Sequence, residues 1–382
     1  MLTREYPPYV YGGAGVHVDF LTRELARHID VDVHCLGAPR AGATAHSEDD
    51  PRLEGANPVL RIFAADLEMA AAVGSCDLVH SHTWYANLGG HVAKVLHDVP
   101  HVVTSHSLEP QRPWKAEQLG GGYRLSSWAE RTAYEAADAV IAVSAASKVD
   151  VLEAYPALDP ACVHVVHNGI DVELYRPDLA TDAVERLGIA AGRPSVVFVG
   201  RITRQKGVSH LLRAALAFDE RAQIVLLAGA ADTPELAAET EAAVGRLREE
   251  RVGVVWISEM LPRTDIIQVL SHATVFVCPS IYEPLRIVNL EAMACATAVV
   301  ASAVGGIPEV VSDDVTGLLV PYDESAPAVF EVGLADAVNR LVADPELAEA
   351  MGVAGRRRAV DEFGWDVAAT RTLDIYRSLV GS

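Results

Sequence analysis

The chain has 382 residues, half of them hydrophobic, and a formal net charge of −21 from 31 basic and 52 acidic side chains. This length allows two domains with well-buried cores. The negative charge argues against nucleic acid and an anionic membrane surface as main partners, because both would be repelled. A phosphate-bearing ligand would therefore have to meet local cations.

The five cysteines are scattered without a CxxC pair, and most lie in apolar runs. We interpret them as reduced packing residues and expect a cytoplasmic protein. No stretch approaches 18 consecutive apolar residues, and no signal peptide precedes the first polar segment, so no membrane association is expected. The opening Met1-Leu-Thr-Arg-Glu leaves little room for a first strand, which suggests that the natural protein begins a few residues earlier.

Apolar runs of strand length alternate with helical patterns along the chain. Strands are expected at 31–36, 78–81, 101–104, 140–143 and 163–166, and then at 195–199, 223–228, 253–257, 274–278 and 298–301. Helical patterns between them include 16–28, 127–137, 207–217 and 235–250. This alternation predicts an α/β protein with two doubly wound, Rossmann-like parallel sheets.

A turn-rich segment at 168–177 separates the two sets of strands and suits a hinge. We predict an N-terminal domain over 1–168, a C-terminal domain over 169–362, and a helix over 363–382 that packs back on the N-terminal domain. Two such domains facing a cleft would accommodate a large ligand.

The segment Tyr11-Gly-Gly-Ala-Gly-Val-His17 opens a helix after the first strand. Its glycines, Gly12 and Gly13 among them, permit close approach of a ligand to the backbone. Val18 replaces the third glycine of a GxGxxG fingerprint, which weakens a dinucleotide interpretation. A tight turn without a ligand is the alternative.

The segment Gly200-Arg-Ile-Thr-Arg-Gln-Lys-Gly207 follows the first strand of the second domain. It places Arg201 and Lys206 at a strand-to-helix corner. A guanidinium can bind two phosphate oxygens, and a lysine adds a mobile point charge. We interpret the corner as a phosphate site, with a solvated basic loop as the alternative.

The segment Ser280-Ile-Tyr-Glu-Pro-Leu-Arg-Ile-Val-Asn-Leu-Glu291 follows an apolar run that predicts a buried parallel strand. Pro284 suits the first turn of a helix, which places Glu283 at the corner where open α/β sheets bind ligands. Glu291 would lie about 12 Å further along that helix at about 1.5 Å per residue. Two carboxylates flanking a helix start with free N–H groups predict a nucleotide-sugar site. Solvated acids on an ordinary helix are the alternative.

Other polar residues follow the strands of the first domain. His106 ends one of them and points toward the expected cleft, although a lone histidine is more often structural. A cluster further along, which would meet an anion or a sugar ring or else form a basic surface loop, consists of Arg112, Trp114, Lys115 and Arg124. His80 and His82 share one face of a strand without a further ligand at metal-site spacing, so no metal site is predicted.

Together these residues resemble a known family. The motifs are Tyr6-Pro-Pro followed by Gly12-Gly13, His106-Ser-Leu-Glu-Pro, Gly200-Arg-x₄-Lys-Gly, and Glu283-Pro-Leu-Arg-Ile-Val-Asn-Leu-Glu291. From about residue 2 to residue 380 the chain resembles the retaining glycosyltransferases of the two-domain GT-B fold. More closely, it resembles the actinobacterial glycogen synthase group, also called α-maltose-1-phosphate synthases.

The resemblance implies a donor, ADP-glucose, bound in the cleft without any metal or other cofactor. Arg201 and Lys206 would bind its diphosphate, Glu291 the ribose hydroxyls and Glu283 the transferred glucose. His106 would lie near the anomeric centre, as a catalytic residue with Glu283, Arg201 and Lys206. The remaining donor-binding residues that the resemblance implies are Gly12, Gly13, Leu285, Arg286 and Ile287.

The resemblance also implies the reaction. The acceptor hydroxyl would attack on the face that the nucleotide leaves, the departing phosphate would take its proton, and the anomeric configuration would be kept. Catalysis would then consist mostly of positioning and of electrostatic stabilisation of the leaving diphosphate. Glu283 would orient the sugar and stabilise positive charge rather than act as a nucleophile.

The chain departs from the family pattern at three positions. Arg286 stands where members usually carry glycine, beside the helix start, where it would either crowd the phosphates or add a contact to them. Val10 and Thr83 stand where the enterobacterial glycogen synthases have a lysine and an aspartate. These two differences favour the maltose-1-phosphate branch.

The leading hypothesis is transfer of glucose from ADP-glucose to the 4-hydroxyl of glucose 1-phosphate, which gives α-maltose 1-phosphate for α-glucan synthesis. The anionic acceptor would explain Arg112, Lys115 and Arg124. The close alternative is a glycogen synthase that extends an α-1,4-glucan from ADP- or UDP-glucose. A nucleotide-sugar epimerase and a weakly active binding protein fit less well. A homodimer is expected only because dimers are the commonest oligomers.

Overall fold

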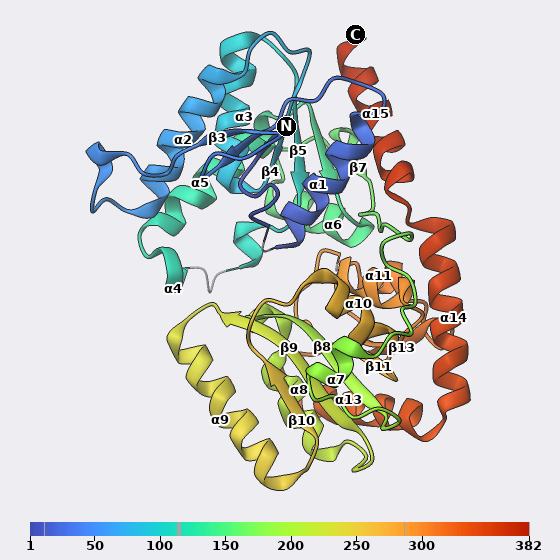
Figure 1. The fold of residues 1–382 in the computed structure, drawn as a ribbon. Helices are drawn as coiled ribbons and strands as arrows, with labels where there is room; N and C mark the ends of the chain where they lie inside the picture. Colours follow the sequence, from blue (N-terminus) through green and yellow to red (C-terminus); the bar gives the residue numbers. More distant parts are fainter. Residues whose placement is uncertain (11, 113–115, 286, 382) are drawn as a thin grey trace. The chain divides into compact units, whose positions relative to one another are not determined.

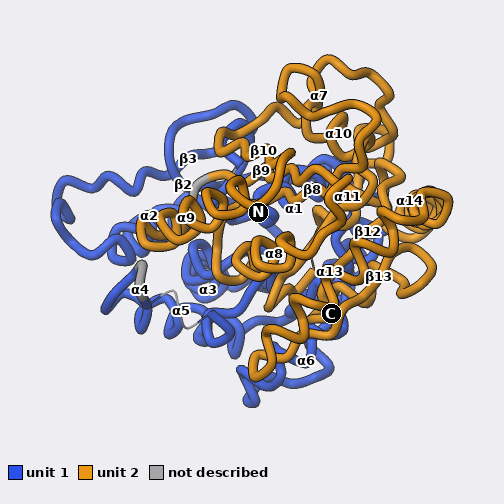
Figure 2. The backbone as a smooth tube through the Cα atoms, turned by 90° about the horizontal axis from the view of Figure 1, so that it is seen from below, with its two compact units in different colours: residues 1–169, 365–382 blue, residues 170–364 orange. Residues whose placement is uncertain are grey.

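The computed structural model describes residues 1–10, 12–112, 116–285 and 287–381 (Figure 1). The chain divides into two compact units, which Figure 2 shows in two colours. Unit 1 comprises residues 1–169 and 365–382, and unit 2 comprises residues 170–364.

Unit 1 is built on a seven-stranded sheet in the order β3-β2-β1-β4-β5-β6-β7, and all of its pairings are parallel. Its strands are β1 (Leu2–Thr3), β2 (His34–Leu36), β3 (Thr44–His46), β4 (Val79–His82), β5 (His101–Ser105), β6 (Ala139–Ala142) and β7 (Val163–Val165). The chain first extends the sheet from β1 toward β3 and then from β4 toward β7. The loops after β1 and β4 therefore flank the switch point where doubly wound sheets bind ligands.

The short strands differ from the sequence prediction. The start of the chain was expected to leave little room for a first strand, yet Leu2–Thr3 pairs with β2, and Leu2 also pairs with β4. Strand β3 was not predicted either. A pairing of two or three residues is too short to produce an apolar run or an alternating pattern.

The helices of unit 1 lie on both faces of the sheet (Figure 1). Helix α3 packs against α2 and α5, and α15 packs against α1. The α-helices are α1 (Gly13–Leu25), α2 (Pro58–Ala72), α3 (Trp84–His97), α4 (Ala116–Leu119), α5 (Gly122–Ala136), α6 (Ala145–Ala154) and α15 (Trp365–Val380). The 3-10 turns among the described residues of this unit are η1 (Pro51–Leu53), η2 (Glu109–Gln111) and η4 (Pro160–Cys162).

Unit 2 contains a six-stranded parallel sheet in the order β10-β9-β8-β11-β12-β13. Its strands are β8 (Ser195–Ile202), β9 (Gln223–Ala231), β10 (Val254–Ile257), β11 (Val275–Cys278), β12 (Ala298–Ser302) and β13 (Gly317–Val320). The switch point lies between β8 and β11. Two doubly wound sheets confirm the predicted fold class.

The helices of unit 2 are α7 (Asp182–Arg186), α8 (Val208–Ala214), α9 (Pro234–Glu250), α10 (Arg263–Ser271), α11 (Ile287–Ala294), α12 (Ile307–Val310), α13 (Pro327–Ala343) and α14 (Pro345–Glu362). The 3-10 turns η5 (Arg204–Lys206) and η6 (Ala215–Ala217) flank α8. Every residue of β11 is fully buried, as an apolar run in a central parallel strand requires.

One helix boundary corrects the sequence prediction. Pro284 was expected in the first turn of a helix, but α11 begins at Ile287. Glu283 and Pro284 therefore lie in the loop after β11, and only the last part of the path from Glu283 to Glu291 is helical. The estimate of about 12 Å assumed helix throughout, so it does not apply.

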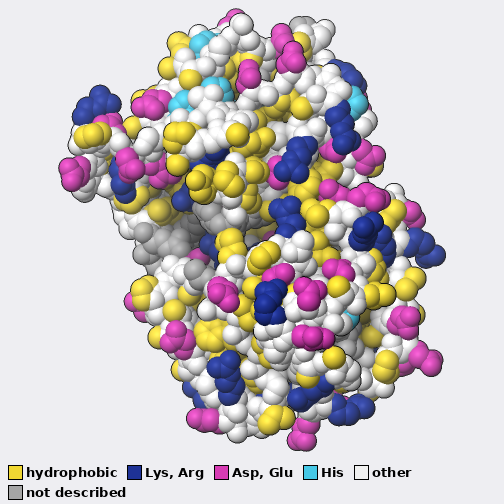
Figure 3. Space-filling view, viewed as in Figure 1, with side chains coloured by type: hydrophobic (Ala, Val, Ile, Leu, Met, Phe, Trp, Pro, Cys, Tyr) yellow, Lys and Arg dark blue, Asp and Glu magenta, His cyan; other side chains and the backbone are white. Residues whose placement is uncertain are grey.

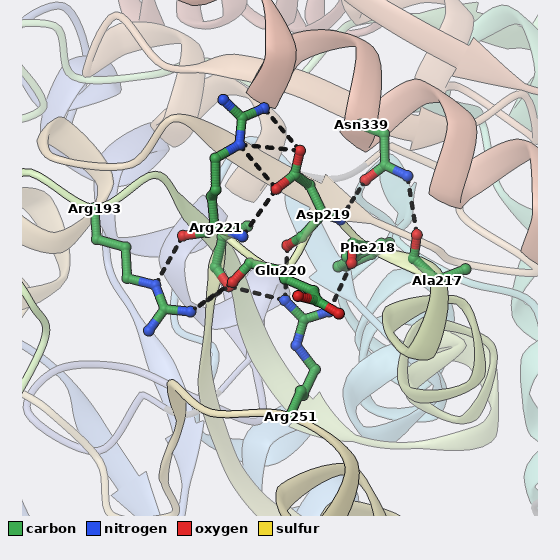
Figure 4. A network of polar contacts seen from close by, with 9 residues as sticks. Arg193, Ala217, Phe218, Asp219, Glu220, Arg221, Arg251 and Asn339 are labelled. Carbon is green, nitrogen blue, oxygen red and sulfur yellow. Dashed lines mark hydrogen bonds and ion pairs between the residues drawn. The ribbon is translucent and has the colours of Figure 1, made fainter.

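An arginine network holds the loops at the amino ends of three unit 2 strands (Figure 4). Arg251 donates to the carbonyl oxygens of four residues in the segment between α8 and β9, namely Ala215, Phe218, Asp219 and Ala222. Arg193 donates to Arg221 O at 2.7 Å, and the Arg221 guanidinium pairs with Asp219. Burial lowers the pKa of Arg251 from its usual value, and the neighbouring Arg193 lowers it further. This edge satisfies backbone carbonyl groups and is structural.

None of the helices that the structure describes combines the length and apolarity of a bilayer-spanning segment. On the face seen in Figure 3, acidic and basic side chains are interspersed. Positive charge on this face is therefore local rather than continuous.

Candidate active site

The switch point of unit 2 brings two predicted site residues together. Lys206 Nζ donates to Glu283 Oε2 at 2.6 Å, and the Lys206 side chain is 21% exposed whereas that of Glu283 is 6% exposed. Ser280 Oγ donates to the same carboxylate oxygen at 3.2 Å. A nearly buried carboxylate needs such partners, because desolvation would otherwise favour its neutral form.

Local sequence fixes the loop that carries Lys206. Thr203 caps η5 by accepting a hydrogen bond from Lys206 N, and Gly207 ends the turn with a φ of +64°. A Cβ atom on Gly207 would lie 1.9 Å from Pro279 O, so only glycine allows the loops after β8 and β11 to meet. Ile281 N donates to Gln205 O at 2.9 Å and joins the same two loops.

A second glycine holds the other side of Glu283. Gly305 has a φ of +53°, and a Cβ atom there would lie 1.9 Å from Glu283 O. Gly306 N donates to the same oxygen at 3.0 Å. The backbone of Glu283 is therefore clamped between close backbone neighbours, which fixes where its side chain starts.

Arg201 lies at the end of β8, where the pairing with β9 shifts register. Its guanidinium contacts Asp232 Oδ1 at 3.0 Å, and its side chain is 44% exposed. A guanidinium oriented by a carboxylate and open to solvent is suited to bind an oxyanion. Arg201 and Lys206 thus belong to the same strand-to-helix connection, as the sequence predicted.

Glu291 lies on α11 and is 8% exposed. Tyr175 donates its hydroxyl to Glu291 Oε1 at 2.9 Å. Burial, together with the charge of Glu291, raises the pKa of Tyr175 far above its usual value, so the hydroxyl remains a donor. Two residues earlier on α11, both side-chain amide atoms of the fully buried Asn289 lack a partner among the described residues.

The remaining predicted donor residues are placed as follows. Leu285 and Ile287 are buried, with 6% and 7% exposure, and flank the start of α11. Arg286 lies outside the described residues. Leu285 and Ile287 therefore contribute apolar packing around the loop that carries Glu283.

In unit 1, the glycine loop is tied to a carboxylate that the sequence analysis did not single out. Gly12 N donates to Glu5 Oε2 at 2.9 Å, and Glu5 is 9% exposed. A Cβ atom on Gly15 would lie 2.7 Å from Glu5, whereas one on Gly13 would meet none of the described residues within 4 Å. Glu5 thus accepts the hydrogen bond from the first N–H group at the start of α1, and none of the described residues fills the space beside Gly13.

His106 follows β5 and is one of three clustered histidines. His106 Nε2 lies 3.0 Å from His82 Nδ1, and the ring centroids of His106 and His17 are 4.7 Å apart. His17 Nδ1 contacts Asn168 Oδ1 at 2.7 Å. Burial lowers the pKa of His17 to about 4 and holds those of His82 and His106 well below the usual range. At neutral pH these rings are uncharged.

Both ring nitrogens of the neighbouring His80 have hydrogen-bond partners within the protein. Its Nε2 lies 2.7 Å from Thr104 Oγ1, and its Nδ1 contacts the hydroxyl of Tyr376. Thr83 directly follows His82, the last residue of β4. Its φ of +65° is a strained conformation for a β-branched residue. Its hydroxyl has no partner among the described residues.

The predicted acceptor residues are only partly described. Arg112 ends η2 and donates to Ser107 Oγ at 3.1 Å, while its Nε has no partner among the described residues. Arg124 is exposed on α5. Trp114 and Lys115 lie outside the described residues.

Two buried carboxyl groups support the turn that follows His106. Glu109 N donates to Glu130 Oε1 at 2.8 Å, the Tyr155 hydroxyl donates to the same oxygen, and Ser126 Oγ donates to Glu109 Oε2 at 2.7 Å. Burial, reinforced by the charge of Glu109, raises the pKa of Glu130 to about 8. Glu130 is therefore mostly protonated at neutral pH, which avoids two adjacent buried charges.

The sequence analysis did not assign roles to several of these residues. His17, Asn168 and Tyr175 are separated from their partners by 65 to 151 positions. A usable signal existed for Asn168 and for two of the histidines that surround His17. His82, His106 and Asn168 each stand at or shortly after the end of a parallel strand, and such ends meet at one edge of a sheet.

The comparisons with known proteins agree with this geometry. Residues 11–174 match the family described as Glycosyltransferase Family 4, and residues 181–358 match Glycosyl transferases group 1. The chain is 60% identical to an α-maltose-1-phosphate synthase of Mycolicibacterium smegmatis, over 99% of this chain and 98% of the relative. It is 59% identical to that of Mycobacterium tuberculosis, with the same coverage. The structure of a sucrose-phosphate synthase from Thermosynechococcus elongatus has a TM-score of 0.78 at 26% identity, and the match covers 100% of this chain and 98% of that one.

Two doubly wound sheets, each with polar residues at its switch point, and these matches define a glycosyltransferase of the GT-B class. The match covers nearly the whole length of the α-maltose-1-phosphate synthases, which narrows the assignment from this class to one family. The chain belongs to the α-maltose-1-phosphate synthase family.

Proposed function

We propose that the protein transfers glucose from ADP-glucose to the 4-hydroxyl of glucose 1-phosphate, with retention, and so forms α-maltose 1-phosphate. The 60% identity to an α-maltose-1-phosphate synthase over 99% of this chain carries the proposal. The cations and carboxylates at the switch point of unit 2 support it, because a sugar nucleotide presents a diphosphate and hydroxyl groups to be bound.

The donor is assigned to unit 2. Arg201 and Lys206 bind the diphosphate, Glu291 accepts hydrogen bonds from the ribose hydroxyls, and Glu283 accepts them from the transferred glucose. Lys206 pairs with Glu283 at 2.6 Å. The incoming diphosphate competes for Lys206, and the sugar hydroxyls then replace the lysine as partners of Glu283.

The chemical step forms one bond and breaks one. The acceptor oxygen bonds to the anomeric carbon on the face from which the diphosphate oxygen departs, and the acceptor proton moves to the departing phosphate. Arg201 and Lys206 stabilise the charge that develops on the diphosphate, while Glu283 stabilises positive charge on the sugar. His106, an uncharged ring at neutral pH, positions the transferred glucose by hydrogen bonding.

The acceptor is assigned to unit 1. Arg112 and Arg124, with Lys115 and Trp114, bind glucose 1-phosphate through its phosphate and its sugar ring. Arg112 has an Nε without a partner among the described residues and therefore retains a donor for an anion. We also propose a cytoplasmic location, a homodimer and a pathway that ends in α-glucan.

The test is an incubation of the full-length protein with ADP-glucose, divided between glucose 1-phosphate and glycogen as acceptors. Phosphorus NMR follows the release of ADP and the appearance of a new sugar phosphate. A maltose 1-phosphate signal, with little release of ADP in the glycogen sample, is expected. UDP-glucose replaces ADP-glucose in a parallel pair of samples to determine the preferred nucleotide.

Two results would overturn the proposal. Release of ADP with glycogen alone would assign the protein as a glucan synthase and leave the acceptor cations without a substrate. Conversion of the donor sugar without any acceptor would indicate an epimerase.

A further inference from the structure

Three histidines from separate elements of unit 1 meet at the carboxyl edge of its sheet. His17 comes from α1, His82 ends β4, and His106 follows β5. One ring nitrogen from each lies within 4.8 Å of the other two. His17 and His82 are at most 2% exposed.

The His17 ring holds a lone pair that none of the described residues uses. Asn168 Oδ1 can only accept, so His17 carries its proton on Nδ1 and presents an unprotonated Nε2. Neither His17 Nε2 nor His82 Nε2 has a partner among the described residues. A ligand bound to His17 Nε2 would offset the cost of burying that atom without a partner.

The contact with Asn168 also orients the His17 ring. A histidine that binds a metal usually donates its second ring N–H to a carbonyl or carboxylate oxygen, which fixes the tautomer and the ring orientation. The contact of 2.7 Å between His17 Nδ1 and Asn168 Oδ1 supplies this arrangement. His17 is therefore oriented as a ligand before any ion arrives.

We propose that His17, His82 and His106 bind one Zn²⁺ ion, and that the bound ion blocks sugar transfer by engaging His106. Imidazole nitrogens suit Zn²⁺, and three histidines with an open fourth position form a known type of zinc site. Binding does not depend on the proposed function. The inhibitory effect does, because it requires His106 to contact the sugar.

The distances are compatible with such a site. Tetrahedral angles and a Zn–N distance of about 2.05 Å place ligand nitrogens about 3.3 Å apart. His82 Nδ1 and His106 Nε2, at 3.0 Å, are already near this separation. The proton now shared between these two nitrogens moves to an outer ring nitrogen, so the two rings stay neutral when the ion binds. His17 must approach by at most about 1.5 Å, because the outer limit of the group is 4.8 Å.

Co²⁺ serves as the spectroscopic probe on the full-length protein after treatment with a chelator. We expect one Co²⁺ per chain, with the visible absorption of a tetrahedral site, and its displacement by Zn²⁺. His17→Gln is expected to weaken binding at least 100-fold. His28→Gln, at an exposed histidine just beyond α1, is the matched control and is expected to bind as the wild type does.

Asn168→Ala keeps all three ligands and removes only the contact to His17 Nδ1. It is expected to weaken Zn²⁺ binding roughly tenfold or more. Circular dichroism establishes whether each variant is folded. If His17→Gln is not folded, the Zn²⁺ affinity of Asn168→Ala decides whether the site exists. Absence of the Co²⁺ absorption in the wild type, or wild-type affinity in a folded His17→Gln variant, would overturn the site.

The inhibitory effect is measured as sugar transfer with and without Zn²⁺, followed by recovery with EDTA. We expect loss of activity at one equivalent of Zn²⁺ and reduced sensitivity in Asn168→Ala. Full activity of the Zn²⁺-loaded wild type would overturn inhibition. Because the Co²⁺ measurement requires no turnover, a protein without transferase activity would refute the proposed function and still give a result for the site.

Discussion

The carboxyl edges of the two sheets share a topology and differ in chemistry. In unit 2, the switch point between β8 and β11 holds an ion pair, Lys206 with Glu283, and two glycines in close contact with backbone. In unit 1, the edge beside β4 and β5 holds uncharged histidines and a protonated carboxyl group, Glu130. One edge is organised by charge and the other by neutral hydrogen bonds.

This difference follows from what each edge is proposed to bind. A diphosphate carries charge and requires cations, which must be balanced when no ligand is bound, and Glu283 balances Lys206. A histidine that contacts a sugar must remain uncharged near a developing positive centre, and burial keeps it so. Changes in charge should therefore affect unit 2 most, and changes in pH should affect unit 1 most.

The largest effect is expected from Gly207→Ala. The alanine would have to adopt a φ of +64° with its Cβ 1.9 Å from Pro279 O, so both backbone strain and a clash contribute. We expect a loss of about 3–5 kcal/mol in the free energy of unfolding, measured with urea and circular dichroism.

Gly188→Ala is the matched control, because Gly188 has a φ of +71° and its Cβ would meet nothing within 4 Å. It should cost only about 1–2 kcal/mol, the price of the backbone conformation. Equal losses in the two variants would show that the contact between the loops after β8 and β11 does not constrain unit 2.

The next effect is expected from Lys206→Ala. This variant removes a cation from the proposed diphosphate site and removes the ion pair between Lys206 and Glu283, whose side chain is only 6% exposed. We expect kcat/KM to fall by about 10²–10³, the range for loss of one group that stabilises developing charge. Arg204→Ala, at an exposed cation of the same turn η5, should change kcat/KM less than about threefold. Comparable losses would mean that net charge, rather than the position of Lys206, supports catalysis.

The sequence predicted which strand ends carry the candidate site better than it predicted the contacts between the site residues. The apolar run at 274–278 placed Glu283 at the end of a buried strand, and the position of Lys206 after β8 followed from the same pattern. Their direct pairing joins residues 77 positions apart, so no local pattern contains it. The start of α11 was misplaced because Pro284 is tolerated both in a first turn and in the loop before it. The histidine cluster depends on the strand order of unit 1, which a single sequence leaves open.

The pH dependence of unit 1 is tested with Glu130→Gln. The pKa of Glu130 is raised from 4.5 to about 8, so its stabilising contribution is complete below about pH 4.5 and is lost as pH rises toward 8. Between pH 5.5 and 7.5 the wild type should lose about 2 kcal/mol of unfolding free energy from this group. Glu130→Gln, which takes up no proton, should show a flatter dependence. Glu135→Gln, at an exposed position of α5, should retain the wild-type slope, and an unchanged slope in Glu130→Gln would refute the assignment.

The smallest effect is expected from Tyr175→Phe, which removes the hydroxyl that donates to Glu291 Oε1 at 2.9 Å. A typical hydrogen bond contributes about 1–1.5 kcal/mol, and in the proposed function this one orients Glu291 toward the ribose. We therefore expect KM for ADP-glucose to rise about five- to tenfold while kcat and KM for glucose 1-phosphate stay unchanged, since uniform binding of the donor is weakened. Steady-state kinetics with each substrate varied in turn separates these effects. A fall in kcat with an unchanged donor KM would place Tyr175 and Glu291 at the reacting sugar instead of the ribose.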